Sequence, residues 1–166
     1  MRSGSYFSGR NELHDEVAVA VALSYNCVMP RYDIYHDVVK RALVKDDWTI
    51  TDDPFEIEYK DVRLFADLGA EKPIAATKGT RRIVVEIKTF ASASLFSELE
   101  KALGQYNIYH MMLKRSKPTR ELYLAVPLDV YDDFFQRPSV QDIVTEYQIR
   151  MFVYEPDDEV ITQWIN

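Results

Sequence analysis

The sequence predicts an α/β protein with a mixed central sheet, and three features of its second half support that class. Residues 81–89 carry the strongest strand pattern of the chain, with β-branched side chains in succession. Apolar residues then recur at helical spacing from Ser92 or Ser94 to about Arg115, which indicates a long amphipathic helix. Residues 121–126 include the apolar run LYLAV, which is typical of a strand buried on both faces. We expect the element order αβββαβ, followed by a helix and a β-hairpin.

The first part of the predicted domain begins with a helix. Asp33 suits its N-cap, and the helix should end near Asp46. The stripe that supports it consists of Ile34, Tyr35, Val38, Val39, Ala42 and Leu43. Strands are then expected over 48–51, 55–59 and 61–67, with a turn at the Asp-Asp-Pro sequence of residues 52–54. Residues 68–77 are rich in small side chains and predict a short helix or an irregular arm.

The elements after residue 80 follow more clearly. The strand over 81–89 should be central, and the long helix ends before Pro118. Its core side is predicted to consist of Leu95, Phe96, Leu99, Ala102, Leu103, Tyr106 and Tyr109. Residues 130–135 and 140–147 have helical patterns, and the strands 150–154 and 159–164 should form a hairpin around the turn at 156–158.

Length and composition indicate one globular domain in a reducing compartment. The chain has 166 residues, of which 47% are apolar and 13% aromatic, enough for one ordinary core. Residues 1–28 are polar and turn-rich at their start, so we expect an N-terminal extension followed by a single domain over 29–166. The lone Cys27 excludes an internal disulfide, and the apolar run 17–23 is too short to cross a membrane. The cytoplasm is therefore the expected location.

Charge is distributed unevenly along the chain. The net charge of −7 argues against a protein that coats nucleic acid with its whole surface. Residues 60–120, however, carry twelve Lys or Arg against six Asp or Glu, so this middle part is +6 and the flanks are −13. One face could therefore meet a polyanion, and Lys114, Arg115, Lys117 and Arg120 are candidates for phosphate contacts. A solvated surface, with cations that favour a helix C-terminus, explains the same pattern.

The predicted central strand carries two charged residues on one face. Side chains alternate along a strand, so Glu86 and Lys88 project to the side opposite Val85 and Ile87. A buried carboxylate and ammonium need each other, a metal ion or water. Asp67 ends another apolar extended segment and brings a second carboxylate. An ion pair at the edge of a sheet, with Asp67 capping a strand, is the structural alternative.

Two carboxylates on neighbouring strands match the ligands of a hard divalent cation. Mg²⁺, or Mn²⁺ in its place, prefers oxygen ligands and keeps several waters. We predict that Asp67 and Glu86 bind the ion with the backbone carbonyl of Ile87, and that Lys88 faces a phosphate oxygen or the attacking water. The chemistry that this set favours is metal-assisted hydrolysis of a phosphodiester.

The spacing from Asp67 to Glu86-Ile87-Lys88, within a strand followed by a long helix, resembles the D…(D/E)xK motif of the restriction-endonuclease-like PD-(D/E)XK superfamily. Gln105 and Tyr109 resemble the QxxxY element that some of its nucleases carry near the site and the nucleic acid. The resemblance implies a nuclease fold, and it makes Asp37 a candidate for a first-helix catalytic acid. Asp37 could instead pair with Arg41 at i+4.

A second resemblance covers nearly all of the chain from Met29 onward. The matching blocks are residues 33–40, 47–51, 67–72, 85–90, 99–106, 122–127 and 163–166. They are similar to the XisH family of fdxN element excision controlling factors, which implies a role in excising a DNA element beside an XisI-like partner and a separate recombinase. Two main functions follow: a Mg²⁺-dependent DNA endonuclease or nicking subunit, or a non-catalytic control factor that binds DNA or the partner. A toxin-like or defence component that uses the same site is a third, weaker alternative. The sequence leaves a homo-oligomer open.

Overall fold

The computed structural model describes residues 31–74 and 79–166, so the predicted extension over 1–28 lies outside the described residues. None of the helices in these two ranges is long and apolar enough to cross a membrane. The elements are α2 (Arg31–Lys45), β1 (Thr49–Asp52), β2 (Phe55–Tyr59), β3 (Val62–Ala66), β4 (Leu68–Ile74), β5 (Gly79–Ile87), α3 (Leu95–Ser116), β6 (Arg120–Pro127), α4 (Leu128–Val130), the π-helix η1 (Tyr131–Phe135), α5 (Pro138–Glu146), β7 (Met151–Glu155) and β8 (Val160–Ile165).

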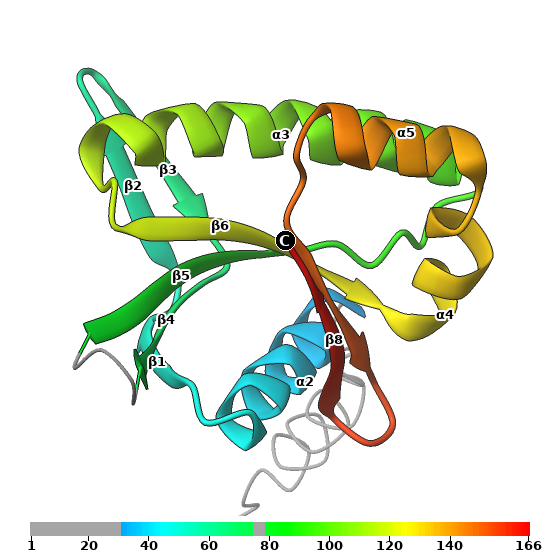
Figure 1. Ribbon diagram of the computed structural model, residues 1–166, viewed down its shortest axis with the longest axis horizontal. Helices are drawn as coiled ribbons and strands as arrows, with labels where there is room; N and C mark the ends of the chain where they lie inside the picture. The colour runs from blue at the N-terminus through cyan, green and yellow to red at the C-terminus, as the bar shows by residue number, and fades with distance from the viewer. Residues whose placement is uncertain (1–30, 75–78) are drawn as a thin grey trace, which may run out of the picture. The chain divides into compact units, whose positions relative to one another are not determined.

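Six strands form the central sheet, in the spatial order β1-β4-β5-β6-β7-β8. Strand β5 is parallel to β6, and β6 is parallel to β7, whereas the other neighbours are antiparallel. The predicted α/β class, the mixed sheet, the central place of β5 and the C-terminal β7–β8 hairpin are all confirmed. Helices α3 and α5 cover one face of the sheet and α2 covers the other (Figure 1).

The alternation of side chains along β5 separates two hydrophobic cores. Val84 packs into the core beneath α3, whereas Ile83, Val85 and Ile87 pack into the core beside α2. Glu86 shares the parity of Val84, so it projects toward α3. The α3 side is thus the side on which the charged residues of this strand meet the rest of the site.

The prediction of a short helix or an irregular arm over 68–77 is wrong for the described part of that segment. Residues 68–74 form β4, which is antiparallel to β5 and fully inside the sheet. Small residues fit here because the strand is closely covered: a Cβ on Gly69 would lie 2.6 Å from Cδ2 of Phe55. The small side chains therefore reflect tight packing, which local sequence patterns do not reveal.

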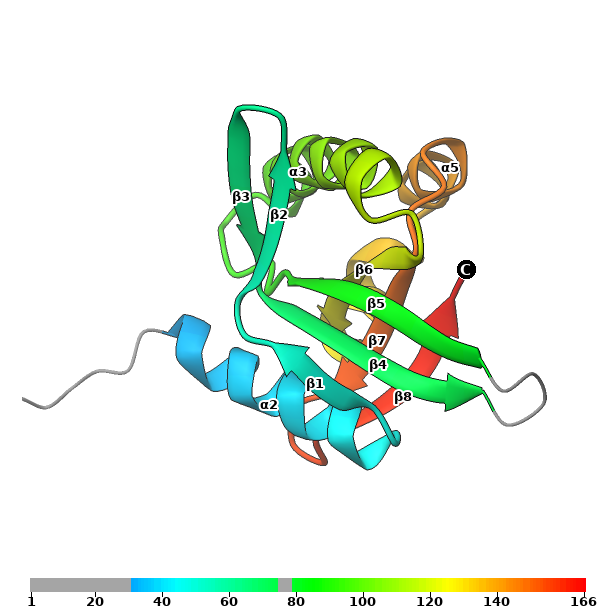
Figure 2. The ribbon, with the colours of Figure 1, turned by 90° about the vertical axis from the view of Figure 1, so that its left-hand side faces the viewer.

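Three finer predictions also differ from the structure. Residues from Arg31 onward are already helical in α2, so Asp33 is not its N-cap. Strands β2 and β3 pair only with each other, as a hairpin beside α3 (Figure 2). Helix α3 begins after the N-cap Ser94 as expected, with the Ser94 side chain accepting a hydrogen bond from the backbone of Ser97. Phe96, predicted on its core side, is 47% exposed.

Candidate metal and phosphodiester site

The candidate site lies where three strand ends meet beneath α3. Asp67 is the single residue between β3 and β4, and Glu86 and Ile87 end β5. Lys88 follows directly, and its backbone N–H still donates to the carbonyl of Ala125 on β6. Figure 2 shows the end of β3, the start of β4 and the end of β5 converging at this point.

Asp67 is bound to the backbone of β5. The N–H of Ile87 donates to Oδ2 of Asp67 over 2.7 Å. Strand β4 starts at Leu68, paired with Val85, so the Asp67 side chain takes the place of the next partner in the ladder. In a strand the N–H and C=O of one residue point the same way, so the carbonyl of Ile87 also points toward Asp67. Asp67 therefore lies against the backbone of Ile87, the residue that follows Glu86.

Glu86, Lys88 and Gln105 form a ring of three hydrogen bonds. Oε1 of Glu86 accepts from Nζ of Lys88 over 2.9 Å and from Nε2 of Gln105 over 2.6 Å. Nζ of Lys88 also donates to Oε1 of Gln105 over 2.8 Å. Glu86 is only 6% exposed, so these charge-assisted bonds replace the solvent that the carboxylate loses.

Tyr109 fixes the amide of Gln105 from the next turn of α3. Its hydroxyl accepts from Nε2 of Gln105 over 2.9 Å and donates to the backbone carbonyl of Phe65 over 2.8 Å. The spacing of four residues puts Gln105 and Tyr109 one above the other on the helix. The pair thereby ties α3 to β3, two residues before Asp67.

Burial and mutual repulsion disfavour the charged forms of both acids. Burial is the main reason that the pKa of Glu86 is raised to about 7; the neighbouring Asp67 adds to it, and Lys88 opposes it. Burial also raises the pKa of Asp67, against the hydrogen bond from Ile87 and the charge of Lys88. Two close carboxylates that repel each other are a place where an added cation is stabilised.

The donor set fits a hard cation with several water ligands. The hydrogen bonds within residues 31–74 and 79–166 use Oδ2 of Asp67 and Oε1 of Glu86, which leaves the second oxygen of each carboxylate for a cation. No group of three or more His, Cys, Asp or Glu side chains that could hold a metal occurs in these ranges. Two carboxylates and one carbonyl suit Mg²⁺ or Mn²⁺ better than a closed zinc site.

Helix α2 brings a second cluster close to Asp67. Asp53 accepts from Nζ of Lys40 over 2.6 Å, and its Oδ1 lies 2.8 Å from Nε2 of His36. Burial raises the pKa of Asp53, but the hydrogen bonds with Lys40 and His36 outweigh burial and lower it overall. The register of β1 against β4, with Asp52 opposite Gly69, puts this cluster next to Asp67.

The sequence did not predict the cluster of His36, Lys40 and Asp53. Asp53 belongs to an Asp-Asp-Pro sequence that indicates only a turn, and His36 has the pattern of a surface residue. Asp37, the predicted helix acid, is exposed and does not join the candidate site. Its expected i+4 partner Arg41 instead bonds Glu159 over 2.7 Å. Asp67, Glu86, Ile87, Lys88 and Gln105 are the predicted residues that the fold brings together.

The chain is similar to one family and to solved structures of that family. The family model described as XisH protein matches residues 29–162. The crystal structure of an XisH family protein from Nostoc punctiforme PCC 73102 is 42% identical, with a TM-score of 0.73, and the match covers 80% of this chain and 99% of that one. The structure of an fdxN element excision controlling factor protein from Anabaena variabilis is 44% identical, also with a TM-score of 0.73, over 81% and 99% of the two chains. No curated protein matches the chain.

Proposed function

The chain belongs to the XisH family, and we propose on this basis that it is an excision controlling factor that hydrolyses phosphodiester bonds of DNA. The observation that carries the proposal is the meeting of two carboxylates, the half-buried Asp67 and the buried Glu86, beside the ammonium group of Lys88. The name of the Anabaena variabilis relative supports the role in excision. The reaction is that of a Mg²⁺-dependent endonuclease or nicking subunit.

Asp67, Glu86 and the carbonyl of Ile87 would hold the divalent cation. A bound Mg²⁺ supplies a Lewis acid for the phosphate and a lower pKa for a coordinated water. The repulsion that raises the pKa of Glu86 supports this assignment, because a cation at the two acids would relieve it. When the separate β2–β3 hairpin is left out, the first elements along the chain are α2, β1, β4, β5, α3 and β6. This αβββαβ order supports a restriction-endonuclease-like arrangement.

Lys88 stabilises the charge that develops on the phosphate during attack. Its Nζ is held between Glu86 and Gln105, so its direction is fixed before DNA binds. Gln105 is a positioning residue because it bonds both Glu86 and Lys88, and Tyr109 in turn holds Gln105. The protein would act on DNA beside an XisI-like protein and a separate recombinase.

One observation favours a second candidate function, that of a non-catalytic control factor. Glu86, Lys88 and Gln105 bond one another directly, so the three side chains stabilise one another. A site that no longer catalyses hydrolysis would retain this network if it stabilises the fold. Such a protein would bind DNA or the XisI-like partner without cutting.

Nicking of supercoiled plasmid in Mg²⁺ or Mn²⁺, compared with EDTA, tests the proposal. We expect nicking only with the cation, and its loss in Asp67→Asn and Glu86→Gln. Glu100→Gln, an exposed position on α3, is the matched control and should nick like the wild type. Titration calorimetry should detect Mn²⁺ binding that the first two variants lack. Equal behaviour of all four proteins, together with binding of an XisI-like protein, would establish the non-catalytic alternative.

A further inference from the structure

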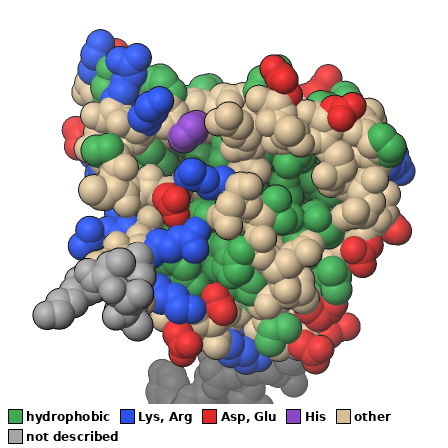
Figure 3. All heavy atoms as spheres, in the orientation of Figure 1, with side chains coloured by type: hydrophobic (Ala, Val, Ile, Leu, Met, Phe, Trp, Pro, Cys, Tyr) green, Lys and Arg blue, Asp and Glu red, His purple; other side chains and the backbone are tan. Residues whose placement is uncertain are grey.

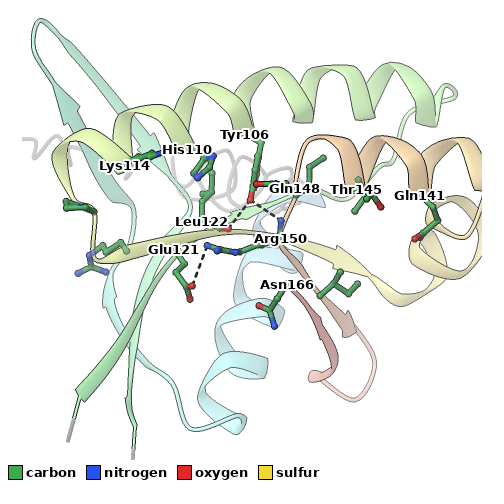
Figure 4. A pocket seen from close by; sticks show the side chains of 15 residues that line it. Tyr106, His110, Lys114, Glu121, Leu122, Gln141, Thr145, Gln148, Arg150 and Asn166 are labelled. Atoms are coloured by element: carbon green, nitrogen blue, oxygen red, sulfur yellow. Dashed lines mark hydrogen bonds and ion pairs between the residues drawn. The ribbon is translucent and has the colours of Figure 1, made fainter. Parts of the chain in front are cut away.

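A cleft of about 800 Å³ opens on a different face of α3 from Gln105. Tyr106, His110 and Lys114 follow one another at i+4 spacing along one wall. The first residues of β6, the second half of α5 with the segment that follows it to Arg150, and the end of β8 form the rest. Figure 4 shows the side chains of His110, Lys114 and Arg150 around this space. Its volume is within the range of small-molecule sites, and none of the residues of the candidate metal site lines it.

Cations outnumber anions around the cleft. Lys114, Arg120 and Arg150 line it, against one acidic side chain, Glu121, although Arg120 also pairs with Asp52 over 3.8 Å. Figure 3 shows most Lys and Arg on the left half of this face, whereas Asp and Glu lie mainly around its upper right, right and lower edges. In a chain with a net charge of −7, such a concentration of cations creates a local positive potential.

Glu121 does not neutralise both Lys114 and Arg150. Glu121 accepts from Arg81 over 2.9 Å and lies 3.4 Å from Nη1 of Arg150, so two guanidinium groups share it. Lys114 is exposed and makes no ion pair with any residue in the described ranges. The pKa of His110 is lowered by burial and also by the charges of Arg150 and Lys114. Among the described residues, Lys114 therefore has no acidic partner and Arg150 shares its one with Arg81, so the cleft can accept an added anion.

The remaining wall supplies neutral donors and a firm support for Arg150. Gln141, Thr145 and Gln148 of the α5 region line the cleft and can complete the coordination of an oxyanion. The backbone N–H of Arg150 donates to the hydroxyl of Tyr106 over 3.0 Å, so the arginine is anchored at its main chain. A guanidinium held this way can bind phosphate oxygens in pairs.

We propose that this cleft binds the phosphate group of a nucleotide, either free or within a single DNA strand. Lys114 and Arg150 contact the phosphate, and the amide and hydroxyl groups of the α5 side contact the sugar. The site is separate from the acids at Asp67 and Glu86, because binding here needs no divalent cation. It would give the protein a second binding site for nucleic acid, on a different face from the candidate metal site.

Binding assays in EDTA with the Glu86→Gln variant keep this test apart from the proposed hydrolysis. The probes are a fluorescein-labelled single-stranded oligonucleotide, deoxyadenosine monophosphate and inorganic phosphate. We expect Lys114→Ala and Arg150→Ala each to weaken oligonucleotide binding about tenfold, since a charge-assisted hydrogen bond is lost. Lys101→Ala, an exposed lysine elsewhere on α3, should change it less than about twofold. Lys114→Glu, at a solvent-exposed position, gives the same comparison if Arg150→Ala fails to fold.

The outcomes separate the sources of the phosphate. Competition by deoxyadenosine monophosphate identifies a free nucleotide as a sufficient ligand, whereas binding of the oligonucleotide alone identifies a DNA strand. Ring-proton resonances of His110 should shift when the ligand binds. The proposal is overturned if no probe binds, or if Lys101→Ala weakens binding as much as Lys114→Ala.

Discussion

Helix α3 contributes to two regions that differ in the sign and the exposure of their charged side chains. On one face Gln105 and Tyr109 complete a buried network around Glu86, which is 6% exposed. On a neighbouring face the exposed His110 and Lys114 border an open cleft that Arg150 also lines. The same helix therefore carries a closed site with acids at its centre and an open site with bases at its rim.

This difference predicts at which positions a single substitution should have a large effect. A buried charge depends on each of its partners, because water cannot replace a lost hydrogen bond there. An exposed cation gains less from any one neighbour and loses less when that neighbour is removed. Substitutions at the buried network should therefore have large effects, and those at exposed positions should have small ones.

Removal of the Lys88 ammonium should have the largest effect. We expect Lys88→Ala to lower the rate of plasmid nicking about 100-fold or more, because one stabilising charge at the reacting phosphate is lost. Initial rates in Mn²⁺ measure it, with Lys101→Ala, at an exposed position of α3, as the control. A nicking rate that survives in Lys88→Ala would remove lysine from the proposed chemistry and leave only the two acids.

The buried acid should also make stability depend on pH. The pKa of Glu86 is about 7 in the folded protein and 4.5 ordinarily, so the folded state binds the extra proton. The free energy of unfolding in EDTA should therefore fall as pH rises from about 4.5 to about 7, by about 3 kcal/mol. Glu86→Gln should lose this part of the dependence and be the more stable protein at about pH 8.

Urea unfolding at a series of pH values measures this effect, and Asp67, whose pKa is also raised, contributes in the same direction. Mg²⁺ should restore the stability of the wild type at about pH 8 and have little effect on Glu86→Gln. A difference between the two proteins that is independent of pH would contradict the burial of an ionisable Glu86.

Tyr109 belongs to the buried network and Tyr106 lines the cleft, so the two tyrosines allow a matched test of the two regions. Tyr109→Phe removes hydroxyl bonds to Gln105 and Phe65, and Tyr106→Phe removes those to Arg150 and Leu122. Each should lower the free energy of unfolding by about 1 kcal/mol. We expect only Tyr109→Phe to slow nicking, and only Tyr106→Phe to weaken oligonucleotide binding. Equal effects of both on both assays would mean that the two regions are not independent.

Asp37→Asn should have the smallest effect. Asp37 is exposed, and among the described residues it has no ion pair, so we expect unfolding and nicking to change by less than about 0.5 kcal/mol. Thermal unfolding and the plasmid assay measure both. A large loss of nicking would instead restore Asp37 to the site and require α2 to move on DNA binding.

Much of the candidate site follows from periodicity along one strand. Glu86 and Lys88 share a face because strand side chains alternate, and Ser94 begins α3 because a serine before an amphipathic run caps a helix. Gln105 and Tyr109 follow from helical spacing. Strand β4 does not follow from local patterns. Its small residues are explained by the close approach of Phe55 to Gly69, which is a contact between two separate segments of the chain.

The sequence by itself determined the α/β class, the central strand, the long helix and the acid and lysine of that strand, since these depend on periods of two and 3.6 residues within one element. Only the tertiary structure decided that Asp67 bonds the N–H of Ile87, that Asp53 joins His36 and Lys40, and that Lys114 and Arg150 border one cleft. Those pairings join residues from different elements. Their closeness depends on strand order and packing, which are properties of the whole chain.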